Sequence, residues 1–230
     1  MSTVSAFRAV GAEIAAFLLA AACAGCEEPG QLLCPSCRAA LVSEPRHHVT
    51  PQGLSVHAAL GYDGVAARCI RRLKADGETH LARPLGAALA AVLTPTVSSS
   101  TWIVPVPTSR SAFRRRGYRV PDLLVRRAGH EPQRLLSLVA RPVDQRGLGV
   151  QQRAANVQGA MRARRVGEGA EAVLVDDVVT TGATLDEAAR ALRAAGFTVV
   201  SAVALAATPR HAEFRGKSSG VHGRRDESHW

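Results

Sequence analysis

Two adjacent carboxylates, Asp176 and Asp177, precede a turn rich in threonine and glycine. An apolar stretch, 172–174, comes before them, and the sequence 186–192 that follows the turn is typical of a helix. We therefore expect a buried strand, a turn and a helix in this order. Ligands of open α/β sheets bind at the carboxyl ends of the strands, and a helix N-terminus with many backbone N–H groups holds phosphate. The carboxylates suit a ribose diol or a metal ion.

The turn itself supplies the expected phosphate donors through backbone N–H groups and hydroxyls. They belong to Val179, Thr180, Thr181, Gly182, Ala183 and Thr184. Thr184 and Glu187 have the spacing of a capping box, which predicts where the helix starts. An ordinary strand–turn–helix unit, with aspartates that cap turns, is the alternative. It accounts for one Asp and one Thr, but not for two adjacent acids followed by Thr-Thr-Gly-Ala-Thr.

A second polar segment follows another apolar strand, 102–107. It begins with Thr108, Ser109 and Arg110, and a run of three arginines, 114–116, comes shortly after. Guanidinium groups pair with phosphate oxygens in a fork geometry, so a strand end that meets several arginines suits a pyrophosphate. The alternative is a basic surface loop, 111–117, that merely follows a strand.

Four of the five cysteines form two Cys-x-x-Cys pairs, Cys23 with Cys26 and Cys34 with Cys37. Four thiolates at this spacing predict a closed, structural Zn²⁺ site with tetrahedral geometry. Two redox dithiols or an iron–sulfur cluster are the alternatives. The fifth cysteine, Cys69, is expected to pack within a helix.

The composition fits a globular α/β protein with one main core and a small appendage. The chain has 230 residues, 47% of them hydrophobic, and a net charge of +10. This charge favours polyanionic partners such as nucleotides, pyrophosphate or nucleic acid, although arginines on solvated faces would also produce it. The apolar stretch 14–24 is too short to span a bilayer, so we expect a cytoplasmic protein without a membrane partner.

Alternating strand and helix patterns predict a mostly parallel open sheet with flanking helices. The expected organisation is a helix (5–22) and zinc module within 1–45, a polar linker (46–53), a main domain (54–208) and a disordered basic tail (209–230). The main domain divides into a hood part, 54–100, and a core, 101–208. The expected strands are 54–60, 102–107, 135–140, 157–161, 172–176 and 198–206, and the expected helices are 65–74, 81–93, 121–128, 147–155 and 184–195.

The segment 175–185 resembles the 5-phosphoribosyl-1-pyrophosphate (PRPP) motif of type I phosphoribosyltransferases. With the cysteine module, the chain resembles the ComF family of that fold over roughly residues 20–207. Further motifs carry the resemblance, and they include Tyr62, Lys74, 104–107, Arg116-Gly117-Tyr118, Arg141, Gln145, Arg153, Asn156 and Gly159-Ala160. The chain departs from the family at Arg119-Val120, where Asn-Gln is usual, and at Met161, where Phe is usual.

The resemblance implies a role for each candidate residue. Asp176 and Asp177 would bind the ribose hydroxyls of PRPP, which carries Mg²⁺, and residues 179–184 would cradle the 5′-phosphate. Ser109, Arg110 and an arginine such as Arg116 would receive the pyrophosphate. Tyr62 and Lys74 would belong to a hood over the acceptor.

Two functions remain open at this point. The first is a phosphoribosyltransferase whose acceptor the sequence does not identify. The second is a non-catalytic PRPP- or nucleotide-binding factor in competence or DNA uptake, acting with a helicase or single-stranded DNA. The sequence does not indicate an oligomeric state.

Overall fold

The computed structural model describes residues 21–139 and 159–209, and in these ranges five strands form a central sheet. The strand order is β1 (Arg46–Val49), β2 (Ser55–Gly61), β7 (Thr198–Ala207), β6 (Glu171–Val179) and β3 (Trp102–Pro105). β2, β7, β6 and β3 run parallel, and β1 adds an antiparallel edge. The predicted α/β class with a mostly parallel sheet is confirmed.

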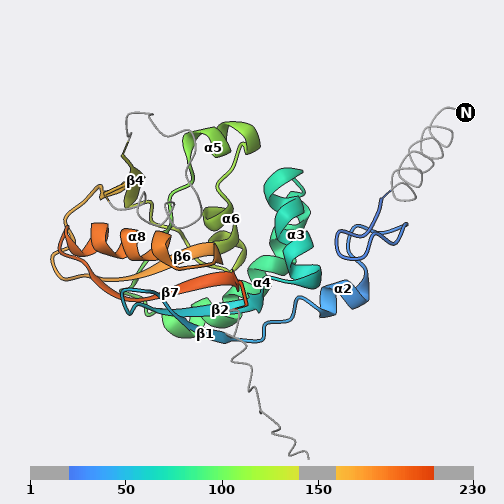
Figure 1. Ribbon diagram of the computed structural model, residues 1–230, viewed down its shortest axis with the longest axis horizontal. Helices are drawn as coiled ribbons and strands as arrows, with labels where there is room; N and C mark the ends of the chain where they lie inside the picture. Colours follow the sequence, from blue (N-terminus) through green and yellow to red (C-terminus); the bar gives the residue numbers. More distant parts are fainter. Residues whose placement is uncertain (1–20, 140–158, 210–230) are drawn as a thin grey trace, which may run out of the picture.

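Helices cover both faces of the sheet, and alternate residues of its strands face the two layers (Figure 1). Val173 and Val175 of β6 belong to the core formed with α3 (Gly64–Ala75), α4 (Ala82–Leu93) and α6 (Val120–Arg127). Ala172 and Leu174 pack on the opposite face, against α8 (Ala183–Arg193). Because both faces of these strands are covered, the central strands read as continuous apolar runs.

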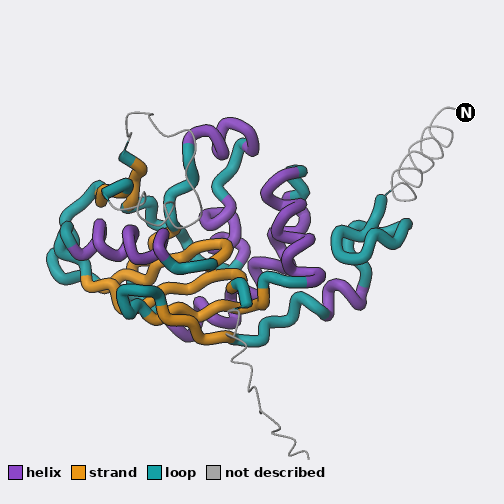
Figure 2. The backbone as a smooth tube through the Cα atoms, viewed as in Figure 1, coloured by secondary structure: helices purple, strands orange, loops and turns teal. Residues whose placement is uncertain are grey.

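Smaller elements complete the described part of the chain (Figure 2). β4 (Leu136–Leu138) and β5 (Met161–Ala163) form an antiparallel pair beside α8. The others are α2 (Pro35–Ala39), α5 (Arg110–Arg116) and two 3-10 turns, η1 (Thr79–Leu81) and η2 (Thr94–Thr96). No helix of the described residues is long and apolar enough to cross a membrane.

Two segments expected to be irregular are regular. The expected linker 46–53 contains β1, an edge strand whose polarity reflects its solvent-facing position, while its residue His48 is buried. The expected basic loop 111–117 is α5, for which Ser109 is the N-cap and Gly117, at φ 79°, the C-cap. Both capping residues were readable from the sequence as helix start and stop signals.

Other expectations differ in their ends or lie outside the described residues. β6 continues to Val179, three residues beyond the expected end of its strand. The expected strand 135–140 is β4, and β5 begins only at the last residue of the expected strand 157–161. The helix expected over 147–155, nearly all of that over 5–22 and the tail from residue 210 lie outside the described residues.

Candidate functional site

The carboxylate pair lies within the carboxyl half of β6. Asp176 is opposite Ala204 of β7, so β7 supports the strand on one side through this point. Asp177 donates its backbone N–H to the Oδ1 of Asp176, at 2.8 Å. The two side chains are largely buried but remain at the edge of the sheet where the strands end, which is where parallel sheets bind ligands.

The turn after β6 exposes Thr180 and Thr181, whereas Val179 is buried and offers only its backbone. Gly182 is the N-cap of α8, with φ 85°. A Cβ on this glycine would lie 2.7 Å from Cγ2 of Thr50, so the turn needs glycine both for its backbone conformation and for its close approach to a neighbour. Ala183, the first residue of α8, donates its N–H to Oγ1 of Thr181 at 3.4 Å.

The predicted capping box is wrong. Thr184 lies inside the first turn of α8, since Gly182 is the N-cap. Glu187 instead accepts the backbone N–H of Met161 at 2.9 Å and the Nε of Arg190 at 2.6 Å. Burial would raise the pKa of Glu187, but these donors outweigh it and lower the pKa. The Glu187 side chain, which the local spacing assigned to the helix cap, therefore makes a tertiary contact with β5.

A residue that the sequence did not single out supports the turn. Thr50, between β1 and β2, donates its hydroxyl to Oδ1 of Asp186 at 2.5 Å, and Gln52 donates its N–H to Oδ2 at 3.2 Å. Thr50 and Asp186 are each only 4% exposed. The turn of the β1–β2 hairpin is therefore anchored to the first turn of α8, next to Gly182.

Lys74 of α3 reaches the carboxylate pair. Its Nζ lies 2.6 Å from Oδ1 of Asp177, and the two side chains are 27% and 14% exposed. Burial, together with the negative charge of Asp177, raises the pKa of Asp176 from 3.8 to about 8. The site therefore contains the Asp177 carboxylate, which is paired with the Lys74 ammonium, and the adjacent Asp176 carboxyl, for which the protonated form is favoured.

The C-terminal end of α3 is held by the last residue of α5 and by the segment that follows it. Arg116 donates its Nε to the carbonyl oxygen of Lys74 at 2.6 Å, and the Tyr118 hydroxyl donates to the carbonyl oxygen of Leu73. Burial raises the pKa of Tyr118. Arg116 was expected to receive the pyrophosphate; in the structure it lies beside Lys74, with one N–H used to position the helix end.

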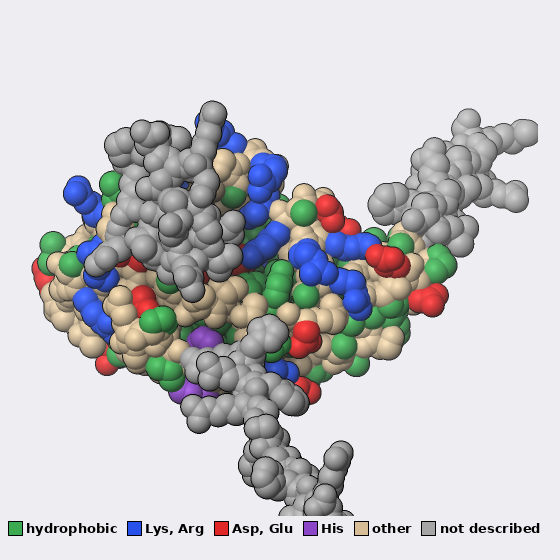
Figure 3. All heavy atoms as spheres, in the orientation of Figure 1, with side chains coloured by type: hydrophobic (Ala, Val, Ile, Leu, Met, Phe, Trp, Pro, Cys, Tyr) green, Lys and Arg blue, Asp and Glu red, His purple; other side chains and the backbone are tan. Residues whose placement is uncertain are grey.

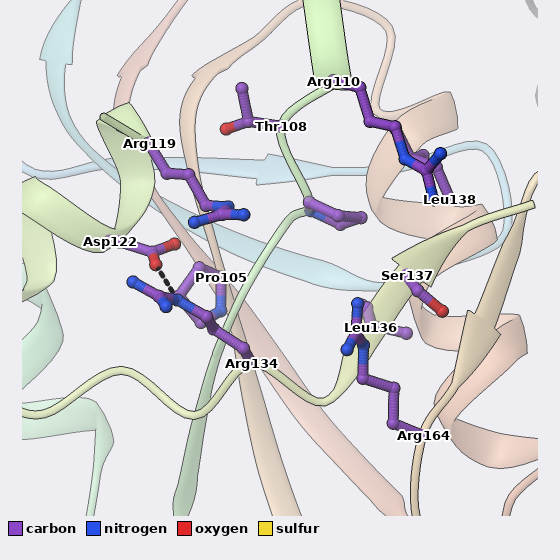
Figure 4. Close-up of a pocket in the computed structure, with 11 residues that line it drawn as sticks. Pro105, Thr108, Arg110, Arg119, Asp122, Arg134, Leu136, Ser137, Leu138 and Arg164 are labelled. Carbon is purple, nitrogen blue, oxygen red and sulfur yellow. Dashed lines mark hydrogen bonds and ion pairs between the residues drawn. The ribbon is translucent and has the colours of Figure 1, made fainter. Parts of the chain in front are cut away.

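The remaining predicted residues make other contacts in the structure. The Ser109 hydroxyl accepts the N–H of Ala112 at 3.2 Å and caps α5. Arg110 is exposed and lines a cavity beside β3 (Figure 4). Tyr62 donates its backbone N–H to the carbonyl oxygen of Ala207 at 2.7 Å, and its half-buried ring packs against the core on the α3 side.

The four predicted zinc ligands come together. The sulfur atoms of Cys23, Cys26, Cys34 and Cys37 all lie within 4.8 Å of one another. The Cys26 and Cys34 sulfurs are 3.7 Å apart, close to the roughly 3.8 Å between ligands of a tetrahedral site with Zn–S bonds of about 2.3 Å. The residues therefore fit a tetrahedral metal ion such as Zn²⁺.

Backbone donors around the sulfurs support this fit. Cys23 Sγ accepts N–H groups from Cys34 at 3.3 Å and Gly25 at 3.4 Å. Burial would raise the pKa of Cys23, but backbone donors from Cys34, Cys26 and Gly25 lower it to about 6. A Cβ on Gly25 would lie 2.5 Å from the sulfur of Cys37, so only glycine fits this turn. These donors favour the thiolate form of Cys23, which is the form that binds metals, whereas burial raises the pKa of Cys37.

The cysteine module is attached to α3. Arg68 donates its Nε to the carbonyl oxygen of Gly25, and Arg72 lies 3.7 Å from Glu27. Cys23 and the predicted helix residue Cys69 are both fully buried in the core that α3 shares with the sheet. The same helix therefore contacts the candidate metal centre and, through Lys74, the carboxylate pair.

Comparison with known proteins points to one class of domain. Residues 120–220 match a family model described as phosphoribosyl transferase domain. The match includes β6, the turn after it, α8 and β7, and it lies outside the cysteine module and α3. In sequence, this part of the chain is similar to a phosphoribosyltransferase domain.

Solved structures of phosphoribosyltransferases are more distant. A hypoxanthine phosphoribosyltransferase from Staphylococcus aureus is 14% identical (TM-score 0.36; 58% of this chain and 65% of that one). UMP synthase from Leishmania donovani is 17% identical, with a TM-score of 0.36, and the match covers 74% of this chain and 30% of that one. Adenine phosphoribosyltransferase from Leishmania tarentolae is 12% identical, with a TM-score of 0.34, and the match covers 75% of this chain and 87% of that one. The chain thus spans less than two thirds of the length of the first two of these proteins. The search of curated proteins found no match.

Proposed function

We propose that this protein binds PRPP with Mg²⁺ and transfers its phosphoribosyl group to an acceptor with a nitrogen nucleophile. The observation that carries the proposal is the arrangement at the end of β6. Two adjacent carboxylates, Asp176 and Asp177, precede a donor-rich turn on the N-terminus of α8, within the residues that match the family model. A sugar diol and its phosphate need these two kinds of group side by side.

In the proposed complex, the carboxylates and the turn contact different parts of PRPP. The carboxylates of Asp176 and Asp177 accept hydrogen bonds from the ribose hydroxyls, and the N–H groups and hydroxyls of 179–184 hold the 5′-phosphate. The bond between C1 of the ribose and pyrophosphate then breaks as the acceptor attacks. The hard oxygens of the two carboxylates would suit Mg²⁺ bound with PRPP, and the cation would supply positive charge to the departing pyrophosphate.

Lys74 balances the charge of the carboxylate pair. Its ammonium sits on Asp177, so the sugar arrives at a pair whose repulsion is partly compensated. We propose that Ser109, Arg110 and Arg116 face the leaving group and that Tyr62 and Lys74 belong to the acceptor side. In the ComF-like organisation that we propose, residues 54–100 form the hood, 101–208 the core and 1–45 the module that binds structural Zn²⁺.

The direct test is pyrophosphate release from PRPP, with Mg²⁺ and a panel of nucleobases and other nitrogen acceptors. We expect release with at least one acceptor and its loss in Asp177→Asn. Asp63→Asn, an exposed acid before α3, is the matched control and should release pyrophosphate at the wild-type rate. Binding of PRPP without release on any acceptor would contradict transfer.

A second candidate function is supported by the charged surface. Arg110, Arg114 and Arg115 are exposed on α5, and Lys and Arg side chains gather on this face over α5 and α3 (Figure 3). In this alternative, the site holds PRPP or a nucleotide as a regulatory ligand while the basic face contacts single-stranded DNA or a helicase, as a competence factor would. It requires DNA binding that weakens steeply with salt. Binding that is absent or insensitive to salt would remove its nucleic-acid part.

A further inference from the structure

Helix α3 makes contacts on two opposite sides. Val65, Arg68, Cys69 and Arg72 recur every three or four residues, so they form one stripe along the helix. Lys74 is two residues beyond Arg72, about 200° around a helix with 3.6 residues per turn, and therefore lies on the opposite side. Figure 1 shows α3 between α6 and the segment that carries the cysteines. The helix thus faces two different parts of the protein.

The stripe packs against the cysteine module, whose described residues are 21–45. Arg68 donates its Nε to the carbonyl oxygen of Gly25. A Cβ on Gly25 would lie 2.9 Å from Cγ1 of Val65 and 2.5 Å from the sulfur of Cys37. Gly25 is therefore sandwiched between the sulfur cluster and the helix, and the two are in close contact.

The cysteine module has little regular structure of its own. Within 21–45 it contains α2, a helix of five residues, and one isolated β-bridge between Ala22 and Pro29. In a segment of this kind, the free energy of metal binding is also free energy of folding. The surface on which α3 packs should therefore be ordered when the four thiolates hold a metal ion and lost when they do not.

The opposite side of α3 contacts the candidate site. Lys74 Nζ lies 2.6 Å from Asp177 Oδ1, and the carbonyl oxygens of Leu73 and Lys74 accept hydrogen bonds from Tyr118 and Arg116. A helix of 12 residues moves largely as one body, because hydrogen bonds join each turn to the next. Loss of the packing partner on one side would therefore displace the Lys74 turn on the other.

We propose that α3 couples the two sites, so that metal binding at the four cysteines strengthens PRPP binding at the end of β6. The inference rests on the proposed function and adds a regulation to it. With the metal bound, the module holds α3, and the Lys74 ammonium offsets the negative charge of Asp177 that an anionic ligand meets. Without the metal, the ammonium leaves Asp177, and the carboxylate pair repels the phosphates of the ligand more strongly.

The first test is backbone hydrogen exchange of the full-length chain, either loaded with Zn²⁺ or stripped of metal by a chelator. We expect metal removal to speed exchange in α3 and at the end of β6 as well as within 21–45. A change confined to 21–45 would overturn the coupling. This readout does not involve PRPP, so it decides the coupling separately from the proposed function, which fails if the zinc-loaded wild type binds no PRPP.

The second test weakens the contact while all four cysteines stay in place. Arg68→Met removes the hydrogen bond to Gly25, and we expect calorimetry to show that the zinc-loaded variant binds PRPP with Mg²⁺ about tenfold more weakly than the wild type, within the usual range of coupling between sites. Arg68→Lys, which can still donate to that carbonyl oxygen, should recover most of the affinity. Arg71→Met, on the exposed side of the same helix, should bind like the wild type. Thermal melts verify that each variant is folded, and equal affinities of Arg68→Met and Arg71→Met would overturn the proposal.

Coupling between two sites is reciprocal, which gives a readout at the cysteines. PRPP, supplied as its Mg²⁺ complex, should strengthen Zn²⁺ binding by the same factor, measured by competition with a chelator. Asp176→Asn/Asp177→Asn should abolish this effect because it removes the contacts with the ribose. An unchanged Zn²⁺ affinity in the wild type, or an equal increase in the double variant, would contradict coupling through the carboxylate pair.

Discussion

The ammonium of Lys74 lies 2.6 Å from the carboxylate of Asp177, although 103 residues separate them along the chain. The pair joins the end of α3 to the end of β6, and Arg116 and Tyr118 hold α3 in place by donating to its last carbonyl oxygens. An ammonium at this position offsets the repulsion between Asp176 and Asp177. The geometry of the candidate site therefore depends on a helix outside the segment that carries its motif.

Replacing Lys74 by methionine should destabilise the fold. The aliphatic stem is kept, but Asp177 is left without its cation beside a second carboxylate, so we expect the free energy of unfolding to fall by about 1–2 kcal/mol. Arg71→Met, on the exposed side of the same helix, should change it by less than about 0.5 kcal/mol. Urea unfolding measures both. Equal effects of the two substitutions would show that the ion pair contributes nothing.

Asp176→Asn should make stability less dependent on pH. Burial and the charge of Asp177 raise the pKa of Asp176 from 3.8 to about 8, so the folded state keeps a proton that the unfolded state has released between these values. The wild type therefore loses stability as pH rises through this window, whereas asparagine stays neutral. Between about pH 6 and about pH 9, the variant should gain about 2–3 kcal/mol relative to the wild type.

The control for this measurement is Asp76→Asn, an exposed acid at the end of α3. Its difference from the wild type should stay constant over the same pH range. A constant difference for Asp176→Asn as well would mean that the Asp176 carboxyl is ionised in the folded protein at pH 6. Asp176→Asn should gain stability but lose PRPP binding, because residues that serve binding often destabilise the fold.

Gly182→Ala should destabilise the turn more than a positive φ alone would. The new Cβ meets Thr50 at 2.7 Å in addition to the strain of φ 85°, so we expect a loss of about 2–3 kcal/mol. Gly53→Ala has nearly the same φ, 83°, with nothing within 4 Å of the added Cβ, and should cost only about 1 kcal/mol. Thermal unfolding compares them. Similar losses would indicate that Thr50 gives way and that the close packing is unimportant.

Local signals predicted much of this fold. The apolar periodicity of 65–74 and 81–93 predicted α3 and α4, and the Cys-x-x-Cys spacing predicted the sulfur cluster, because these patterns depend on neighbours in sequence. The predictions failed where a distant partner decided the outcome. Glu187 bonds to Met161 across 26 residues instead of capping its own helix, and β1 is a strand only because β2 pairs with it.

The same reason limits what the sequence indicated about the candidate site. The motif grouped Asp176 and Asp177 with the turn that follows them, but it did not name Thr50, which supports that turn from another strand pair. Lys74 was expected in the hood, and the sequence did not indicate which residue it contacts. Arg116 was named as a candidate for a phosphate, but its hydrogen bond to the end of α3 was not predicted. Such contacts arise only when the helices and the sheet pack together.

Cys34→Ser should abolish Zn²⁺ binding by the proposed four-cysteine site and weaken the contacts of α3. Loss of one thiolate opens a four-ligand site, and a structural metal contributes directly to folding free energy. We expect the zinc content to fall and the unfolding temperature to drop, whereas Cys69→Ala should keep its zinc because Cys69 lies outside the cluster. Atomic emission and thermal melts measure these effects. Full zinc content in Cys34→Ser would contradict four-cysteine ligation.

The central claim is that the end of β6 binds PRPP, and calorimetric titration of PRPP with Mg²⁺ tests it most directly. The zinc-loaded wild type is compared with the Asp176→Asn/Asp177→Asn double variant and with Asp63→Asn. We predict saturable binding by the wild type and by Asp63→Asn, and a loss of at least about a hundredfold in affinity for the double variant, which lacks both ribose contacts. Undiminished binding by the double variant, or none by the wild type, would contradict the account.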